Sequence, residues 1–205
     1  WKAAKDAGIK PIIGCEVYLA PRSRFDRTYD RDSEAEHLVL LCENGEGYKN
    51  LMKMVSLAWT EGFYIKPRVD MELIKSCSKG LICLSACIAG RIPRLILKGQ
   101  YEKAKAFALE LDEIFGRGNF YFEMQDHGIP EQKTVNAAIL RLHAETGIPL
   151  VATNDAHYVK RENAELQDVL MCIQTVKKLD DKDRMRFETE EFYLKSEEEM
   201  RSLFP

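Results

Sequence analysis

The chain has 205 residues, of which 45% are hydrophobic and 31% charged, a composition typical of a globular domain and not of a disordered or fibrous segment. Its net charge of −3 gives no overall basic footprint, so charge balance does not indicate nucleic-acid binding, although bound metal ions can supply local positive charge. No apolar run approaches the roughly 20 residues that span a bilayer. The six cysteines contain no CxxC pair, so we expect free thiols, a reducing cytoplasmic location and no membrane association.

The first two predicted strands each carry an ionisable side chain. Residues 10–20 read as a strand with Glu16 inside it, and residues 37–42 as a strand that begins at His37. A charged group in a buried strand is costly unless it is paired or binds a metal. The charged segment between these strands, residues 22–35, is predicted to be a mobile loop.

A basic and aromatic segment, residues 63–70, is predicted to be a loop. It places Tyr64, Lys66 and Arg68 close together in the sequence. Basic groups beside an aromatic ring can hold a phosphate and stack a base, so these residues are candidate substrate contacts. A solvated loop without such a role is the simpler alternative, and the residues alone leave both open.

The next two predicted strands also lead into candidate ligands. Residues 80–85 form a strand followed by Cys87, which is either a buried structural thiol or a thiolate metal ligand. Residues 119–125 form a strand that ends in Asp126 and His127. Helices are expected around these strands, over residues 89–97, 101–115 and 131–146.

The strand predicted over residues 150–153 changes abruptly from apolar residues to Asn154, Asp155 and His157. Barrels of the α/β class build their sites at such C-terminal strand ends. In an extended chain, residues two apart project to the same side, so Asp155 and His157 suit one divalent metal. A capping aspartate beside a surface histidine is the alternative interpretation.

In the C-terminal part a helix is predicted over residues 163–173, with Leu166, Val169, Leu170 and Ile173 on its inner face, and another helix is predicted to begin after Ser196. Residues 177–191 read as a connecting loop or lid. Strands and helices alternate along the chain, which implies parallel strands in a barrel or a doubly wound sheet. In a parallel barrel the C-terminal strand ends share one face, so the candidate ligands would meet there.

Six segments, in this order, carry a resemblance to a known family: KPIIGCEVYLAPRSRFDR, HLVLLCENGEGYKNLMKMVS, EGFYIKPRVD, GLICLSACIAGRIP, FEMQDHGIPEQ and VATNDAHYV. The set closely resembles the PHP (polymerase and histidinol phosphatase) domain of bacterial DNA polymerase III alpha subunits of the DnaE type, over essentially the whole chain. The resemblance implies an α/β fold, a distorted (β/α)7 barrel with up to three divalent metals (Zn, Mn or Mg) at its C-terminal strand ends.

The resemblance also implies roles for single residues. Glu16 matches the family's usually bridging glutamate, His37 the histidine of its third motif, and Cys87 a position that is histidine in many phosphatases and often cysteine in polymerases. Asp155 and His157 match the last Asp-x-His pair. These five residues are the expected metal ligands, with Glu16, Asp155 and His157 also catalytic. The weaker expected substrate contacts are Tyr64, Lys66, Arg68 and His127.

The sequence departs from the family at its start. PHP domains open with a strand carrying His-x-His and a second carrying an Asp-His pair, and neither occurs here. We therefore expect an incomplete barrel without its N-terminal strands, which binds fewer metals than an intact domain. Residues 1–205 are expected to form a single domain, and residues 178–205 are a candidate start of the connection to a polymerase core.

Three functions are compatible with the resemblance. The favoured one is a metal-dependent phosphoesterase, acting as a 3′–5′ proofreading exonuclease within a replicative polymerase alpha subunit. The alternatives are an inactive PHP module that contacts the polymerase and a separate proofreading subunit, and a small-molecule phosphatase of the histidinol-phosphate type. The implied partners are DNA, the proofreading subunit and, through the rest of a polymerase chain, the sliding clamp. This stretch lacks the acidic residues of a polymerase palm, so we expect that it does not extend DNA by itself.

Overall fold

Seven strands form the sheet of the protein, in the order β3-β4-β1-β2-β5-β6-β7. The computed structural model describes residues 1–204. The strands are β1 (Gly14–Leu19), β2 (Glu36–Cys42), β3 (Phe63–Tyr64), β4 (Lys66–Val69), β5 (Leu81–Leu84), β6 (Phe120–Met124) and β7 (Leu150–Ala152). Within the described residues β3 and β7 do not pair, so the sheet stays open, as expected of an incomplete barrel.

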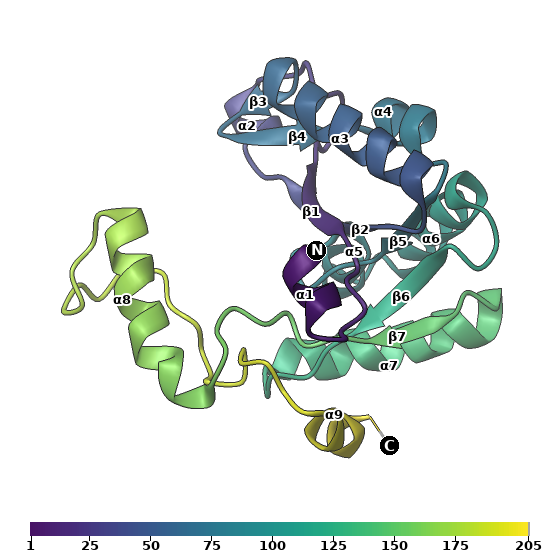
Figure 1. The fold of residues 1–205 in the computed structure, drawn as a ribbon. Coiled ribbons are helices and arrows are strands. Elements are labelled where there is room, and N and C mark those ends of the chain that lie inside the picture. Colours follow the sequence, from purple (N-terminus) through teal and green to yellow (C-terminus); the bar gives the residue numbers. More distant parts are fainter. Residues whose placement is uncertain (205) are drawn as a thin grey trace.

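Helices connect the strands and pack around the sheet (Figure 1). They are α1 (Lys2–Asp6), α2 (Tyr29–Asp32), α3 (Gly45–Thr60), α4 (Met71–Cys77), α5 (Arg91–Leu97), α6 (Tyr101–Phe115), α7 (Pro130–Thr146), α8 (Ala164–Thr175) and α9 (Glu197–Leu203). Local signals fix several ends. The Asn44 side chain accepts hydrogen bonds from two backbone N–H groups of the first turn of α3, as an N-cap should. Gly147 closes α7 at a φ of 73°, which favours glycine. None of these helices is long and apolar enough to cross a membrane.

The strand directions differ from the all-parallel sheet that the alternation predicts. Strand β2 runs antiparallel to both β1 and β5, and β3 runs antiparallel to β4, whereas β6 is parallel to both β5 and β7 and β1 is parallel to β4. A parallel return requires a long crossover, usually a helix. Only the four-residue α2 lies between β1 and β2, and β2 accordingly returns in the opposite direction.

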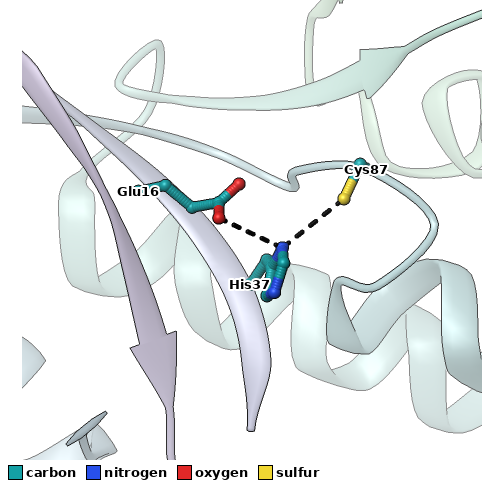
Figure 2. Close-up of side chains that lie close together, drawn as sticks. All are labelled: Glu16, His37 and Cys87. Atoms are coloured by element: carbon teal, nitrogen blue, oxygen red, sulfur yellow. Dashed lines mark hydrogen bonds and ion pairs between the residues drawn. The ribbon is translucent and has the colours of Figure 1, made fainter. Parts of the chain in front are cut away.

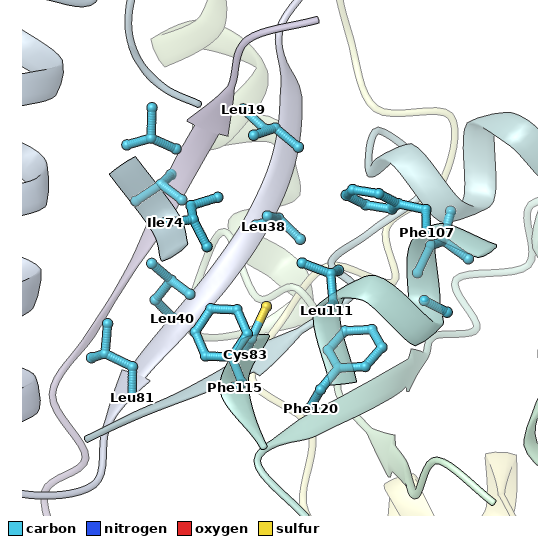
Figure 3. Packing of buried hydrophobic residues seen from close by; sticks show 14 of the residues in the cluster. Leu19, Leu38, Leu40, Ile74, Leu81, Cys83, Phe107, Leu111, Phe115 and Phe120 are labelled. Carbon is cyan, nitrogen blue, oxygen red and sulfur yellow. The ribbon is translucent and has the colours of Figure 1, made fainter. Parts of the chain in front are cut away.

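The two faces of the sheet have different roles, because side chains alternate along each strand. One face supplies the hydrophobic core and packs against helices (Figure 3). Its buried residues include Leu19 of β1, Leu38 and Leu40 of β2, and Phe120 and Phe122 of β6. The other face carries Glu16 and Tyr18 of β1, His37 of β2, and Tyr121 and Glu123 of β6. The candidate site lies on that second face.

Residues 22–35, predicted to be a mobile loop, are instead tied to the sheet by ion pairs. Arg22 pairs with Asp32 at 2.7 Å, and Arg24 pairs with Asp70, the N-cap of α4, at 3.0 Å. Arg68 donates to backbone carbonyls in this segment and to Gly62. We call these five residues the ion-pair cluster: Arg22, Arg24, Asp32, Arg68 and Asp70.

Helix α8 also differs from its prediction. It stands apart from the rest of the chain in Figure 1. Leu166, Leu170 and Ile173, expected on an inner face, are 62%, 58% and 69% exposed, whereas Val169 of the same expected face is half-buried and Met171 and Cys172 are buried. The apolar pattern predicted the helix correctly, but nothing among residues 1–204 covers this side of it.

Candidate metal centre

Three predicted ligands from different parts of the chain meet on the second face of the sheet (Figure 2). The β1–β2 register pairs Tyr18 with His37, so Glu16, two residues away, lies on the same face near His37. The His37 Nδ1 atom is 3.3 Å from Glu16 Oε1 and 3.6 Å from Cys87 Sγ. All three donor atoms lie within 4.8 Å of one another. We call Glu16, His37 and Cys87 the metal centre.

The spacing of these donors fits one small divalent ion. In tetrahedral zinc sites, bonds of about 2.0–2.1 Å to N or O and about 2.3 Å to S place an N and an O donor about 3.3 Å apart, and an N and an S donor about 3.6 Å apart. The observed separations are 3.3 and 3.6 Å. Three protein ligands with a further position open is also the usual arrangement of catalytic zinc. The residues present therefore fit a metal.

The turn that carries Cys87 is held tightly against His37. Ala86 adopts a φ of 66° directly before Cys87, a conformation that costs free energy for a residue other than glycine. The His37 N–H donates to the Ala89 carbonyl at 3.2 Å. A Cβ on Gly90 would lie 2.4 Å from the Ser85 carbonyl oxygen, so only glycine fits at this crossing. These contacts fix the direction in which the thiol points.

The electrostatics of the three groups differ. The hydrogen bond from His37 holds the pKa of Glu16 below its usual value, although burial opposes this. Burial raises the pKa of the Cys87 thiol to about 12, and the carboxylates of Asp155, Glu16 and Glu123 add to that effect. The carboxylate would therefore be available to hold a cation, whereas the thiol would have to release its proton to solvent before it could do so.

Comparison with known proteins identifies the family. The family model described as PHP domain matches residues 1–127. The chain belongs to the PHP domain family. It is similar to the DNA polymerase III subunit alpha of Treponema pallidum, with 48% identity over 205 residues, and of Borreliella burgdorferi, with 49% over 205 residues. It is also similar to that subunit of Thermus aquaticus, with 45% over 207 residues. Each alignment covers all of this chain but only 17–18% of the relative.

In this PHP domain, the last two predicted ligands border the metal centre without joining the donor cluster. Strand β7 ends at Ala152 and Asp155 has a φ of 45°, so the pair is not extended as the sequence suggested. The turn brings His157 Nδ1 to 2.8 Å from the Asp155 carbonyl oxygen and to 4.0 Å from its carboxylate. Both residues act on the centre through charge, because His157 helps to lower the pKa of Glu16 and Asp155 helps to raise that of Cys87.

Among the predicted substrate contacts, Lys66 lies nearest the centre. Its exposed Nζ is 3.2 Å from the Tyr18 hydroxyl. Lys66 also contributes, after His37 and His157, to the lowered pKa of Glu16. Tyr64 is half-buried, and its ring lies 5.1 Å from the Arg68 guanidinium. Of these residues, Lys66 has a cationic group placed both near the centre and in solvent.

Arg68 and His127, predicted as substrate contacts, are each only 1% exposed. Arg68 donates to the carbonyls of residues 24, 26, 32 and 62. The two ring nitrogens of His127 lie 2.6 Å from the Asn154 carbonyl oxygen and 2.7 Å from Gln132 Nε2, and its ring stacks on Phe192. Both side chains are therefore buried and hydrogen-bonded inside the protein, unlike the exposed Lys66.

Sequence reasoning missed Glu123. This acid lies in β6, is 6% exposed, and faces the same side of the sheet as the metal centre. The signal was present in the sequence, since a carboxylate inside an apolar strand is the same pattern that singled out Glu16. Attention to the polar residues after the strand, Asp126 and His127, drew the interpretation away from it.

Proposed function

We propose that this PHP domain is the metal-dependent phosphoesterase part of a bacterial DNA polymerase III alpha subunit, in which it acts as a 3′–5′ exonuclease. The observation that carries the proposal is the position of His37 Nδ1 between a carboxylate and a thiol, at 3.3 and 3.6 Å. Relatives of this chain are named as DNA polymerase III alpha subunits, which favours a polynucleotide as substrate. The chain spans less than a fifth of their length.

Each residue contributes a separate part of the proposed activity. Glu16, His37 and Cys87 hold a divalent ion, which when bound supplies Lewis acidity toward a phosphoryl oxygen. Zinc, manganese and magnesium are the candidate ions, and the thiol and imidazole favour zinc among them. Asp155 and His157 complete the ligand set from the β7 side. Lys66, beside Tyr18, offers a positive charge for a backbone phosphate of DNA.

A second candidate function is that of an interaction module. The exposed apolar side of α8, formed by Leu166, Leu170 and Ile173, favours it, because such surfaces mark contacts with other protein segments. The partners would be the remainder of a polymerase chain, its proofreading subunit and, further along, a sliding clamp. This role is compatible with an active centre. No contact described above favours a small-molecule phosphatase of the histidinol-phosphate type.

A cobalt titration of the purified chain tests the proposal. Co²⁺ replaces zinc in such sites and reports a bound thiolate through a near-ultraviolet charge-transfer band. We expect saturable binding with this band, and loss of the band in Cys87→Ser. Cys42→Ser, a half-buried thiol on the same sheet but outside the centre, is the matched control and should bind as the wild type does.

Hydrolysis of a 3′-labelled oligonucleotide then tests the activity in an alpha subunit that contains this domain. We expect release of the 3′-terminal nucleotide, sensitive to a chelator and abolished by Glu16→Gln. An absence of cobalt binding in the wild-type chain, together with an absence of chelator-sensitive nuclease in the longer protein, would exclude the phosphoesterase and leave the interaction module.

A further inference from the structure

A buried acid that belongs to neither the metal centre nor the ion-pair cluster lies beneath the site. Glu123 on β6 is 6% exposed, and within residues 1–204 no lysine or arginine forms an ion pair with it. Burying a carboxyl group without a cation is unfavourable unless hydrogen bonds compensate. Its hydrogen bonds therefore show what holds it there, and they connect it to two parts of the chain.

The first part is the turn that carries Cys87. The Glu123 N–H donates to Ser85 Oγ at 2.9 Å, and the Ser85 N–H donates to the Tyr121 carbonyl at 3.1 Å. Burial raises the pKa of Glu123, and the hydrogen bonds from Thr153 and Gln125 oppose this rise. Ser85, two residues before Cys87, is thus bonded to the backbone of Glu123.

The second part is the segment that carries Asp155. Thr153 Oγ1 donates to Glu123 Oε1, and Gln125 Nε2 donates to both of these oxygens, at 3.0 and 3.1 Å respectively. The three side chains form a closed triangle. Thr153 follows the end of β7 and lies two residues before Asp155. One carboxyl oxygen therefore holds the exit of β7 against β6.

The other carboxyl oxygen, Oε2, has no hydrogen-bond partner in the described part of the chain, although it is buried. Gln125 Oε1 and Asn154 Oδ1, which belong to residues close in sequence to Glu123 and Thr153 respectively, are likewise buried without a partner in that part of the chain. Buried acceptors without donors are rare in folded proteins and are usually satisfied by ordered solvent or a ligand.

We propose that Glu123 is a positioning residue of the metal centre: its backbone N–H holds Ser85 in the turn that carries Cys87, its carboxyl group holds the β7 exit that carries Asp155, and Oε2 accepts a hydrogen bond from solvent. The inference rests on the proposed metal function. Residues that orient ligands in this way typically alter metal affinity by about 10–100-fold when removed. Glu123 would thus keep Cys87 and Asp155 in fixed positions relative to each other without contacting the metal itself.

The test compares Glu123→Ala with Glu123→Gln in the cobalt titration. Glu123→Ala should weaken Co²⁺ binding by about 10–100-fold and change the thiolate charge-transfer band, because the β7 exit that carries Asp155 is no longer held and the coordination geometry around the ion changes. Glu123→Gln keeps the shape and an oxygen for Thr153, and should recover most of the affinity. Glu131→Ala, at the exposed start of α7, is the control for loss of one glutamate and should not differ from wild type.

Urea denaturation of each variant separates positioning from general stability. If Glu123→Ala does not fold, Thr153→Val removes the hydroxyl donor at nearly constant volume and should weaken cobalt binding several-fold. Wild-type affinity and an unchanged band in the folded variant would overturn the positioning role alone. Weaker binding with an unchanged band and no recovery in Glu123→Gln would also overturn it. No cobalt binding by the wild type would overturn the proposed function and this inference together.

Discussion

The ion-pair cluster and the metal centre are both groups of polar side chains that adjoin the sheet, but they differ in how completely their charges are satisfied. In the ion-pair cluster, Arg22 and Arg24 each pair with a buried aspartate at 2.7 and 3.0 Å, and Arg68 donates to four backbone carbonyls. In the metal centre, an acid, an imidazole and a thiol face one another without a cation. The first group is complete, and the second has donor atoms left for a ligand.

The titration of the aspartates and of the Cys87 thiol reflects the same difference, whereas the pKa of Glu16 is lowered by its bond to His37, as in the ion-pair cluster. Asp32 has its pKa lowered, first by its bond to Arg22, and Asp70 has its pKa lowered by hydrogen bonds and Arg24 against the effect of burial. Cys87 instead has its pKa raised to about 12. Lowered carboxylate values mean that the folded state already stabilises the charged form. The raised thiol value means that stabilisation must come from a group that binds there.

Removing Arg68 should have the largest effect on folding. Arg68→Met deletes a buried guanidinium and leaves the carbonyl oxygens of residues 24, 26 and 32 without this donor, so the free energy of unfolding should fall by about 3–5 kcal/mol. Urea denaturation followed by circular dichroism measures this. Lys66→Met, on the same strand but exposed, is the control and should change stability little. A small loss of unfolding free energy in Arg68→Met would show that the two groups do not differ in how completely their charges are satisfied.

Removing the Cys87 thiol should show the opposite behaviour. Cys87→Ser should leave the free energy of unfolding of the metal-free chain nearly unchanged, because the thiol satisfies no essential partner. It should weaken Co²⁺ or Zn²⁺ affinity by more than about 100-fold, since loss of a ligand costs more than loss of a supporting residue. Competition with a chelator of known affinity gives the value. Strong destabilisation without a change in affinity would identify Cys87 as a structural residue.

The pH dependence of metal uptake sharpens this result. Because the pKa of the thiol is about 12, Cys87 is protonated at neutral pH and must release one proton when a metal binds. Apparent affinity should therefore rise about tenfold per pH unit in mildly alkaline buffer. In Cys87→Ser this slope should be absent. A wild-type affinity that does not change with pH would mean that the thiolate is not a ligand.

How far the sequence predicts this arrangement depends on the kind of information needed. The positions of most strands and helices, and of Glu16, His37 and Cys87, follow from local apolar patterns and from the family resemblance. Strands β3 and β4 do not, because residues 63–70 carry too many polar residues and read as a loop. The burial of Arg68 does not, because its acceptors come from residues 24–32, which are distant in sequence. The exposed side of α8 is likewise invisible, since periodicity shows that a helix has an apolar side but not what covers it.

The candidate site shows the same limit of prediction from sequence. Extended geometry would place Asp155 and His157 side by side, but the left-handed turn at Asp155 changes their relation. The role proposed for Glu123 depends on Thr153 and Ser85, which only the parallel pairing of β5, β6 and β7 brings together. Sequence patterns identify which residue types are out of place in a strand, whereas the pairing of strands decides which of them meet.

The smallest expected effect comes from a third group, in which Glu145 of α7 pairs with Lys105 of α6 at 2.9 Å and with Arg141 at 2.7 Å. These bonds lower the pKa of Glu145 from 4.5 to about 2. Because the folded-state value is the lower one, the pair stabilises the protein above pH 4.5 and loses this contribution as the pH falls toward about 2.

Glu145→Gln should therefore differ from wild type in thermal stability at neutral pH and converge with it in acid. The difference should be small and should decrease in high salt, since solvent screens such pairs. The charges of this group are paired as completely as those of the ion-pair cluster, but the group lies at the surface. A loss of unfolding free energy as large as that of Arg68→Met would therefore show that complete charge pairing alone, and not burial, determines how much such a group stabilises the protein.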